Sequence, residues 1–135
     1  MNTKLVMVLR DDLPRGLAVN AAAVLALSLG GRLDGWLGAD GKDASGGVHA
    51  GLNTHPVPVV TATGRELREL RERAADRSEL RVVAFNEVAR RSRDYDDYLA
   101  ALEATPGEEI GYVGALVFGP RGPVTKLTKR FPLMR

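Results

Sequence analysis

Two continuous apolar runs constrain the fold of this chain more than any other feature. Residues 5–9 read Leu-Val-Met-Val-Leu, and residues 111–118 read Gly-Tyr-Val-Gly-Ala-Leu-Val-Phe. A strand that faces water on one side alternates apolar and polar residues, so these runs indicate strands that are covered on both faces. The sequence therefore predicts a central sheet with helices packed on both of its sides.

Strand and helix patterns alternate along the rest of the chain. Thr63 and Glu66 have the spacing of a capping box, which predicts a helix from there to about residue 76. Asn86 is expected to cap a second helical region, and Asp94 to restart it after a break. The other expected elements are an Ala-rich helix over 16–29, strands over 57–60 and 81–85, a sharp turn over 119–123, a short helix over 124–129 and an extended piece over 131–134.

This order predicts one α/β domain over residues 1–135. We expect three layers, in which a central mixed, mostly parallel sheet of four to five strands carries helices on both faces. A glycine-rich loop over residues 30–56 lies within that domain, with a short strand expected near 34–37. Loops of this length in compact domains are usually functional or mobile.

The charge of the chain is unevenly distributed. The net charge is +2, but five basic residues and no acidic residue follow Glu109, so that segment carries +5 and residues 1–109 carry −3. A basic C-terminal segment favours tRNA or another anionic ligand as a partner, and a solubilising surface is the alternative. The five residues are Arg121, Lys126, Lys129, Arg130 and Arg135.

Composition narrows the classes of function. The chain has no cysteine, which rules out a disulfide framework, a thiol nucleophile and a cysteine-ligated zinc. The Ala-rich stretch is shorter than the roughly 20 residues that span a bilayer, so no membrane association is expected. No secretory signal pattern is recognisable, and we expect a cytoplasmic protein with no cofactor and no metal.

The first candidate site lies at the corner after the first strand. Arg10, Asp12 and Asn20 are expected at the strand's C-terminal end, where open α/β sheets bind ligands. Asn20 is the one polar residue in a very apolar stretch of helix, and a buried amide needs hydrogen-bond partners. In the alternative, Asp12 simply caps the free backbone donors of the helix that follows.

The second candidate site lies in the glycine-rich loop. Asp43, Ser45 and His49 invite comparison with a catalytic triad, and His49 alone is suited to act as a general base. The simpler interpretation is a loop histidine that fixes the surrounding backbone. A metal site formed with Asp40 and His55 is a further option, although the ligand spacing typical of zinc sites is missing.

The chain contains two ordered motifs: Arg10-Asp11-Asp12-Leu13 followed by Gly16, and Val117-Phe118-Gly119-Pro120 followed by Lys126-Leu127-Thr128. In these two segments it resembles the type 2 peptidyl-tRNA hydrolase superfamily, whose motifs occur in the same order. The resemblance implies its fold, and it implies that Lys126 and Thr128 reach the same cleft as the first candidate site. Together with the two candidate sites, it predicts catalytic residues and substrate-binding residues. The catalytic residues are Asp12, Asn20, Lys126 and His49, and the substrate-binding residues are Arg10, Asp43, Thr125 and Thr128. Leu17, Val24 and Thr125 stand where those enzymes typically carry a lysine, a histidine and an aspartate.

Four further stretches have a recognisable pattern: residues 8–23, Gly46-Gly47-Val48-His49, Pro56-Val57-Pro58-Val59 and residues 124–128. With these stretches the whole chain looks closer to a bacterial family called domain of unknown function 2000.

Three hypotheses follow for the function. The first is hydrolysis of the ester of peptidyl-tRNA or a related acyl-RNA by Asp12, Asn20, Lys126 and His49. The second is a non-catalytic RNA-binding module, suggested by the three substituted positions. The third is a small-molecule enzyme or sensor that uses the loop of Asp43 and His49. A homodimer through the Ala-rich helix is expected in addition.

Overall fold

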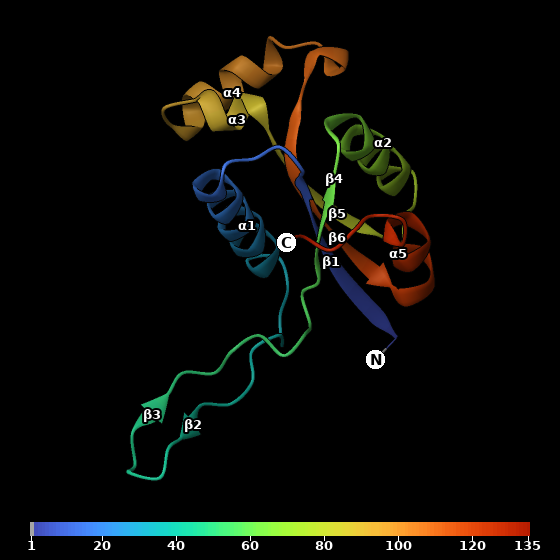
Figure 1. Ribbon diagram of the computed structural model, residues 1–135. Helices are drawn as coiled ribbons and strands as arrows, with labels where there is room; N and C mark the ends of the chain where they lie inside the picture. The colour runs from blue at the N-terminus through green and yellow to red at the C-terminus, as the bar shows by residue number, and fades with distance from the viewer. Residues whose placement is uncertain (1) are drawn as a thin grey trace.

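Strand β1 (Thr3–Arg10) lies inside the four-stranded sheet of the computed structural model, which describes residues 2–135 (Figure 1). It pairs in parallel with β4 (Val59–Ala62) and antiparallel with β6 (Tyr112–Pro120), and β5 (Arg81–Asn86) pairs with the other edge of β6. The sheet order is thus β4-β1-β6-β5. The two apolar runs form the inner strands β1 and β6, which are covered on both faces as predicted.

The expectation of a mostly parallel sheet was wrong. Only the β1–β4 pair is parallel, while β1–β6 and β5–β6 are antiparallel. The reason is the path between β5 and β6. Helices α3 (Glu87–Arg91) and α4 (Tyr95–Glu103) and the 3-10 turn η1 (Gly107–Glu109) lie on this path without crossing the sheet, because β6 starts beside the end of β5, where Asn86 pairs with Tyr112.

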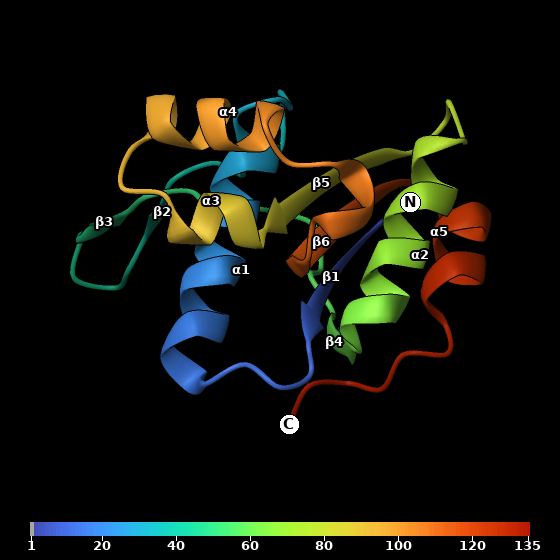
Figure 2. The same cartoon turned by 90° about the horizontal axis from the view of Figure 1, so that it is seen from above.

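Helices cover both faces of the sheet, which confirms the three layers. Helix α1 (Arg15–Gly30) lies on one face, and α2 (Gly64–Ala75) and α5 (Arg121–Thr128) lie on the other (Figure 2). Alternate residues of β1 separate into two cores. Leu5, Met7 and Leu9 pack towards α1, whereas Val6 and Val8 pack towards α2 and α5.

Side-chain caps fix the helix starts that the sequence indicated. The Thr63 hydroxyl accepts from the Glu66 amide at 3.1 Å, and the Glu66 carboxylate accepts from the Thr63 amide at 2.9 Å. The side chain of Asn86 accepts from the Ala89 amide and caps α3, and that of Asp94 accepts from the Asp97 amide and caps α4, each at 2.8 Å. The predicted break between the two helices is therefore confirmed.

The C-terminal region differs in one respect from the prediction. No separate turn spans residues 119–123, because β6 continues to Pro120 and α5 begins at once with Arg121, whose amide donates to the Asn2 carbonyl at 2.8 Å. The extended piece after α5 is confirmed. Thr61 donates to the Pro132 carbonyl, and Met134 donates to the Val59 carbonyl, so this piece runs along the outer edge of β4.

Residues 37–53 form an arm that projects from the rest of the molecule (Figure 1). It is a narrow hairpin in which β2 (Gly41–Lys42) pairs with β3 (Val48–His49). The short strand expected near 34–37 is reduced to a single bridge between Leu37 and Asn53. At the base of the arm, Trp36 stacks on His55 with ring centroids 3.8 Å apart and meets the edge of Phe118.

We predict that Thr63→Ala lowers the free energy of unfolding by about 1 kcal/mol, a decrease of about 4 °C in Tm, because the Glu66 amide in the first turn of α2 loses its acceptor. Thermal unfolding followed by circular dichroism measures the change. Thr63→Ser keeps the hydroxyl and should unfold close to the wild-type temperature. Equal losses in both variants would contradict the capping role.

Candidate functional site

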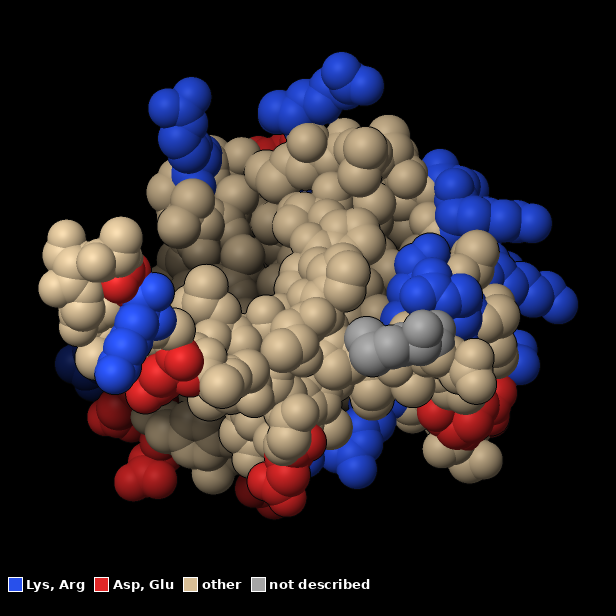
Figure 3. Space-filling view, turned by 90° about the horizontal axis from the view of Figure 1, so that it is seen from below, with Lys and Arg blue, Asp and Glu red and all other residues tan. Residues whose placement is uncertain are grey.

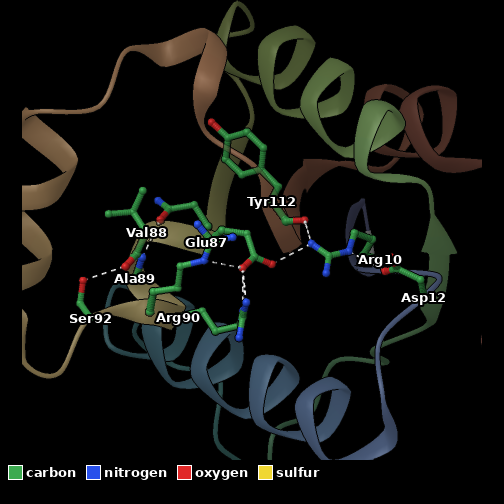
Figure 4. A network of polar contacts seen from close by, with 10 residues as sticks. Arg10, Asp12, Glu87, Val88, Ala89, Arg90, Ser92 and Tyr112 are labelled. Carbon is green, nitrogen blue, oxygen red and sulfur yellow. Dashed lines mark hydrogen bonds and ion pairs between the residues drawn. The ribbon is translucent and has the colours of Figure 1, made fainter.

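Arg10 is the central residue of the corner after β1. Its Nε donates to Asp12 Oδ1 at 2.6 Å, and its Nη1 donates to Glu87 Oε1 at 2.9 Å and to the Tyr112 carbonyl at 3.0 Å (Figure 4). One guanidinium therefore joins the end of β1, the start of β6 and the first turn of α3.

Glu87 holds the other side of this network. Its side chain is only 12% exposed, and its Oε2 accepts from Arg90 Nε at 2.7 Å and lies 3.7 Å from Arg91 Nε. Sequence reasoning missed Glu87 and Arg90, because a charged first turn after a capping asparagine is ordinarily solvated. The one available signal was a glutamate followed by arginines three and four residues later, which is the spacing of ion pairs on one helix face.

The network holds both carboxyl groups in the ionised form. The hydrogen bond from Arg10 lowers the pKa of Asp12. Burial opposes ionisation of Glu87, but hydrogen bonds from Arg90 and Arg10 outweigh it and lower the pKa of that carboxyl. A general acid or base works best with a pKa near the working pH, so neither carboxylate is suited to proton transfer at neutral pH. The arrangement is suited to holding the end of β1 in place against α3 and β6.

Two residues of the first candidate site lie differently from the expectations. Asp12 does not cap α1, because Pro14 occupies the N-cap position and no side chain caps it. Asn20 is exposed, so the expectation of a buried amide was wrong. Only one side of α1 meets the sheet, and Asn20 lies outside that side, whose buried residues are Ala18, Ala21, Leu25 and Leu29.

The C-terminal candidates lie near the other end of β1. Thr125 Oγ1 accepts from Lys4 Nζ at 3.2 Å, near the start of the strand that Arg10 ends. Five residues of strand lie between Lys4 and Arg10, which places the two residues about 20 Å apart. The structure shows no hydrogen bond or ion pair between Asp12 and Lys126. The Thr128 hydroxyl is buried and donates to the Val124 carbonyl of its own helix.

Asp43 and His49 do meet, at the tip of the arm. Asp43 accepts from the amides of Ser45 and Gly47, both at 2.9 Å, and its Oδ2 lies 2.9 Å from His49 Nε2. The contact with His49 and the two amides lowers the pKa of Asp43. These contacts close the turn, as in the simpler interpretation of a histidine that fixes its loop. Within residues 2–135 no three metal-ligating side chains come together, and His55 stacks on Trp36.

Basic residues gather around α5. We call the group formed by Lys4, Arg121, Lys126, Lys129 and Arg130 the basic surface. Figure 3 shows Lys and Arg side chains crowded on the side of the molecule where α5 lies. Arg130 is 3.7 Å from Glu66, whereas Lys126 and Lys129 are exposed and have no ion pair within residues 2–135. These two ammonium groups are therefore available to an external anion.

Comparison with known proteins places the chain in a family. Residues 3–135 match the family described as protein of unknown function DUF2000. The chain belongs to the DUF2000 family. A solved structure of a protein of unknown function, Atu0240 from Agrobacterium tumefaciens strain C58, is similar to this DUF2000 chain with a TM-score of 0.90. The two share 22% sequence identity, with 100% of this chain and 99% of that chain covered, so the likeness shows the fold alone.

No curated protein matches this DUF2000 chain. The resemblance to type 2 peptidyl-tRNA hydrolases stays a prediction. No helix within residues 2–135 has both the length and the apolar character needed to cross a membrane.

We predict that Glu87→Gln lowers the free energy of unfolding at pH 7 by about 2 kcal/mol, because charge-assisted hydrogen bonds to two arginines are weakened. The pKa of Glu87 is lower in the folded chain. Its stabilising effect is therefore complete at neutral pH and is lost as the pH falls below about 5 through the folded pKa.

Urea unfolding at pH 7 and at pH 3 measures the difference between Glu87→Gln and the wild type. The difference should shrink in acid. Glu108→Gln, an exposed glutamate of η1, is the matched control and should have little effect at either pH. A difference for Glu87→Gln that is unchanged by pH would contradict the ionised state of this carboxylate.

Proposed function

We propose that this protein binds RNA through the basic surface and does not hydrolyse an acyl ester on that RNA. The observation that carries the proposal is a pair of exposed lysines, Lys126 in the last turn of α5 and Lys129 just after it. Neither has an ion pair within residues 2–135, and both lie in a C-terminal segment without acidic residues. Lys4 extends this charge onto β1 through its contact with Thr125.

Phosphate contacts explain why such a surface suits a nucleic acid. Each lysine or arginine that neutralises a phosphate releases condensed counterions, and this release drives binding without reading the base sequence. Structured RNA is recognised largely through its shape, its phosphates and its 2′-hydroxyls. Lys126 in the last turn of α5 and Lys129 just after it present separated, exposed cations that can follow a phosphate backbone.

Ester hydrolysis is less well supported by the geometry. It needs Asp12 and Lys126 to act on one bond, but Asp12 pairs with Arg10 at the end of β1 and Thr125, the neighbour of Lys126, contacts Lys4 near the start. The lowered pKa of Asp12 further weakens it as a base. Binding without cleavage requires only the charges that the structure already exposes.

We predict that the protein binds unfractionated tRNA with a steep dependence on salt. If about four phosphates are contacted, the logarithm of the binding constant should fall with the logarithm of salt concentration with a slope of about −3 to −4. Lys126→Ala/Lys129→Ala should weaken binding at every salt concentration and make the slope shallower by about 2. Filter binding over a salt series measures both quantities.

A variant with the same loss of charge elsewhere is the control. Arg91→Ala/Arg93→Ala removes two exposed cations on the side of α3 and α4, away from α5, and should leave the slope unchanged. Binding that is insensitive to salt, or equally weakened by both double variants, would contradict the proposal.

A further inference from the structure

The arm has no hydrophobic core of its own. Its two strands contain two residues each, and residues 39–50 are all exposed. An isolated two-stranded hairpin is marginally stable at best in water, since it needs a third strand or a packed helix to bury its apolar side chains. The arm therefore lacks, within one copy of the chain, the packing that would hold it in place.

Apolar side chains on the arm point into solvent. Leu37, Val48 and Leu52 are 73%, 65% and 79% exposed. Single exposed apolar residues are normal on protein surfaces, but three on one narrow hairpin mark a surface suited to burial against another molecule.

The shape of the arm is nevertheless fixed by its sequence. The Gly51 amide donates to Asp40 Oδ1 at 2.8 Å, and the Gly38 amide donates to the Leu52 carbonyl at 2.9 Å. A Cβ on Gly51 would lie 1.9 Å from the Gly38 carbonyl oxygen, so only glycine allows the two sides of the hairpin to approach this closely. A segment with a defined shape and exposed apolar side chains is built to dock.

Helix α1 offers a surface of the same kind. Val19 and Leu27 on its outer side are 65% and 78% exposed, and no charged residue occurs between Gly16 and Gly31. Beside it lies a cleft of about 400 Å³ between α1, β5 and the α3–α4 pair, whose apolar lining includes Val24, Phe85 and Tyr95. The outer side of α1 is thus largely apolar, with Asn20 as an exposed polar residue, and nothing within residues 2–135 covers it.

Length and charge match the arm to this face. The eight residues of extended chain from residue 37 to residue 44 span about 26 Å, and the 16 residues of α1 span about 24 Å. Asp40, Lys42 and Asp43 give the arm a net charge of −1. Arg15 and Arg32, at the two ends of α1, have no ion pair within residues 2–135, and Asp11 and Asp34 lie further from the helix. A second copy of this chain supplies both surfaces at once.

We propose that the arm of one copy lies along the outer side of α1 of a second copy, and that the second arm does the same in return. Such a two-fold arrangement buries both arms and both α1 faces in one closed interface. It is independent of RNA binding, because the basic surface around α5 lies on the opposite face of the sheet from α1.

Sedimentation equilibrium at micromolar concentration tests the dimer. The wild type should have twice the chain mass of 14.5 kDa. Leu52→Asp on the arm and Leu27→Asp on α1 should each give monomers that keep the wild-type circular dichroism, since both side chains are exposed. Leu133→Asp changes an equally apolar residue, 62% exposed, outside both surfaces and should remain dimeric.

Gly51→Ala provides a test from within the arm. It prevents the two sides of the hairpin from approaching closely and so distorts the arm, while the sheet and its helices are unchanged. This variant should therefore also be monomeric, with a folded sheet and helices. A monomeric wild type would overturn the proposal, and so would a dimer that survives Leu52→Asp and Gly51→Ala.

Cross-linking identifies the contact, and the absence of native cysteines makes it specific. A chain with Val48→Cys is mixed with a tagged chain carrying Leu27→Cys and treated with a short bis-maleimide. The expected product joins one chain of each kind. A dimer that gives no such product, although each thiol still reacts with a mono-maleimide, would overturn the proposed contact.

Discussion

Pairing on both edges of β1, with both of its faces covered, is the interaction on which the rest of the structure depends. Val8 is completely buried, and its neighbours Met7 and Leu9 are 2% exposed. Because β4 and β6 both pair with β1, its position sets where α1, α2 and α5 are placed. The polar corner of Arg10 and the contact of Lys4 with Thr125 are consequences of where this strand ends and begins.

The two ends of β1 have different electrostatic characters. At the C-terminal end, arginines and carboxylates neutralise one another around Glu87, and little charge is left for an external ligand. Near the N-terminal end, Lys126 and Lys129 have no acidic partner within residues 2–135. The first arrangement stabilises the fold, and the second is open to an anion. This difference favours binding by the basic surface over chemistry at the corner.

Much of the fold could be predicted from the sequence because its signals are local. The capping box at Thr63, the side-chain caps at Asn86 and Asp94, and the apolar runs all depend on neighbouring residues. The direction of β6 could not be predicted, because it depends on whether α3 and α4 cross the sheet. No local sequence pattern indicates whether a connection crosses. The exposure of Asn20 was missed for a related reason, since composition alone does not show that one side of α1 lacks a partner.

The candidate site was predictable only in part. Asp43 and His49 do meet, and Arg10 does pair with Asp12, because these residues are close in sequence. The separation of Asp12 from Thr125 and the role of Glu87 depend on contacts between residues more than 70 positions apart. Such contacts follow from sheet order, so they became visible only with the structure.

The most direct test of the account is to incubate the protein with N-blocked aminoacyl-tRNA and to follow both the bound RNA and the intact ester over time. The account predicts that the tRNA is retained at low salt while its ester decays no faster than in buffer. Ester cleavage by the wild type that is abolished by Asp12→Asn and by Lys126→Ala would contradict it, because the two ends of β1 would then act on one bond.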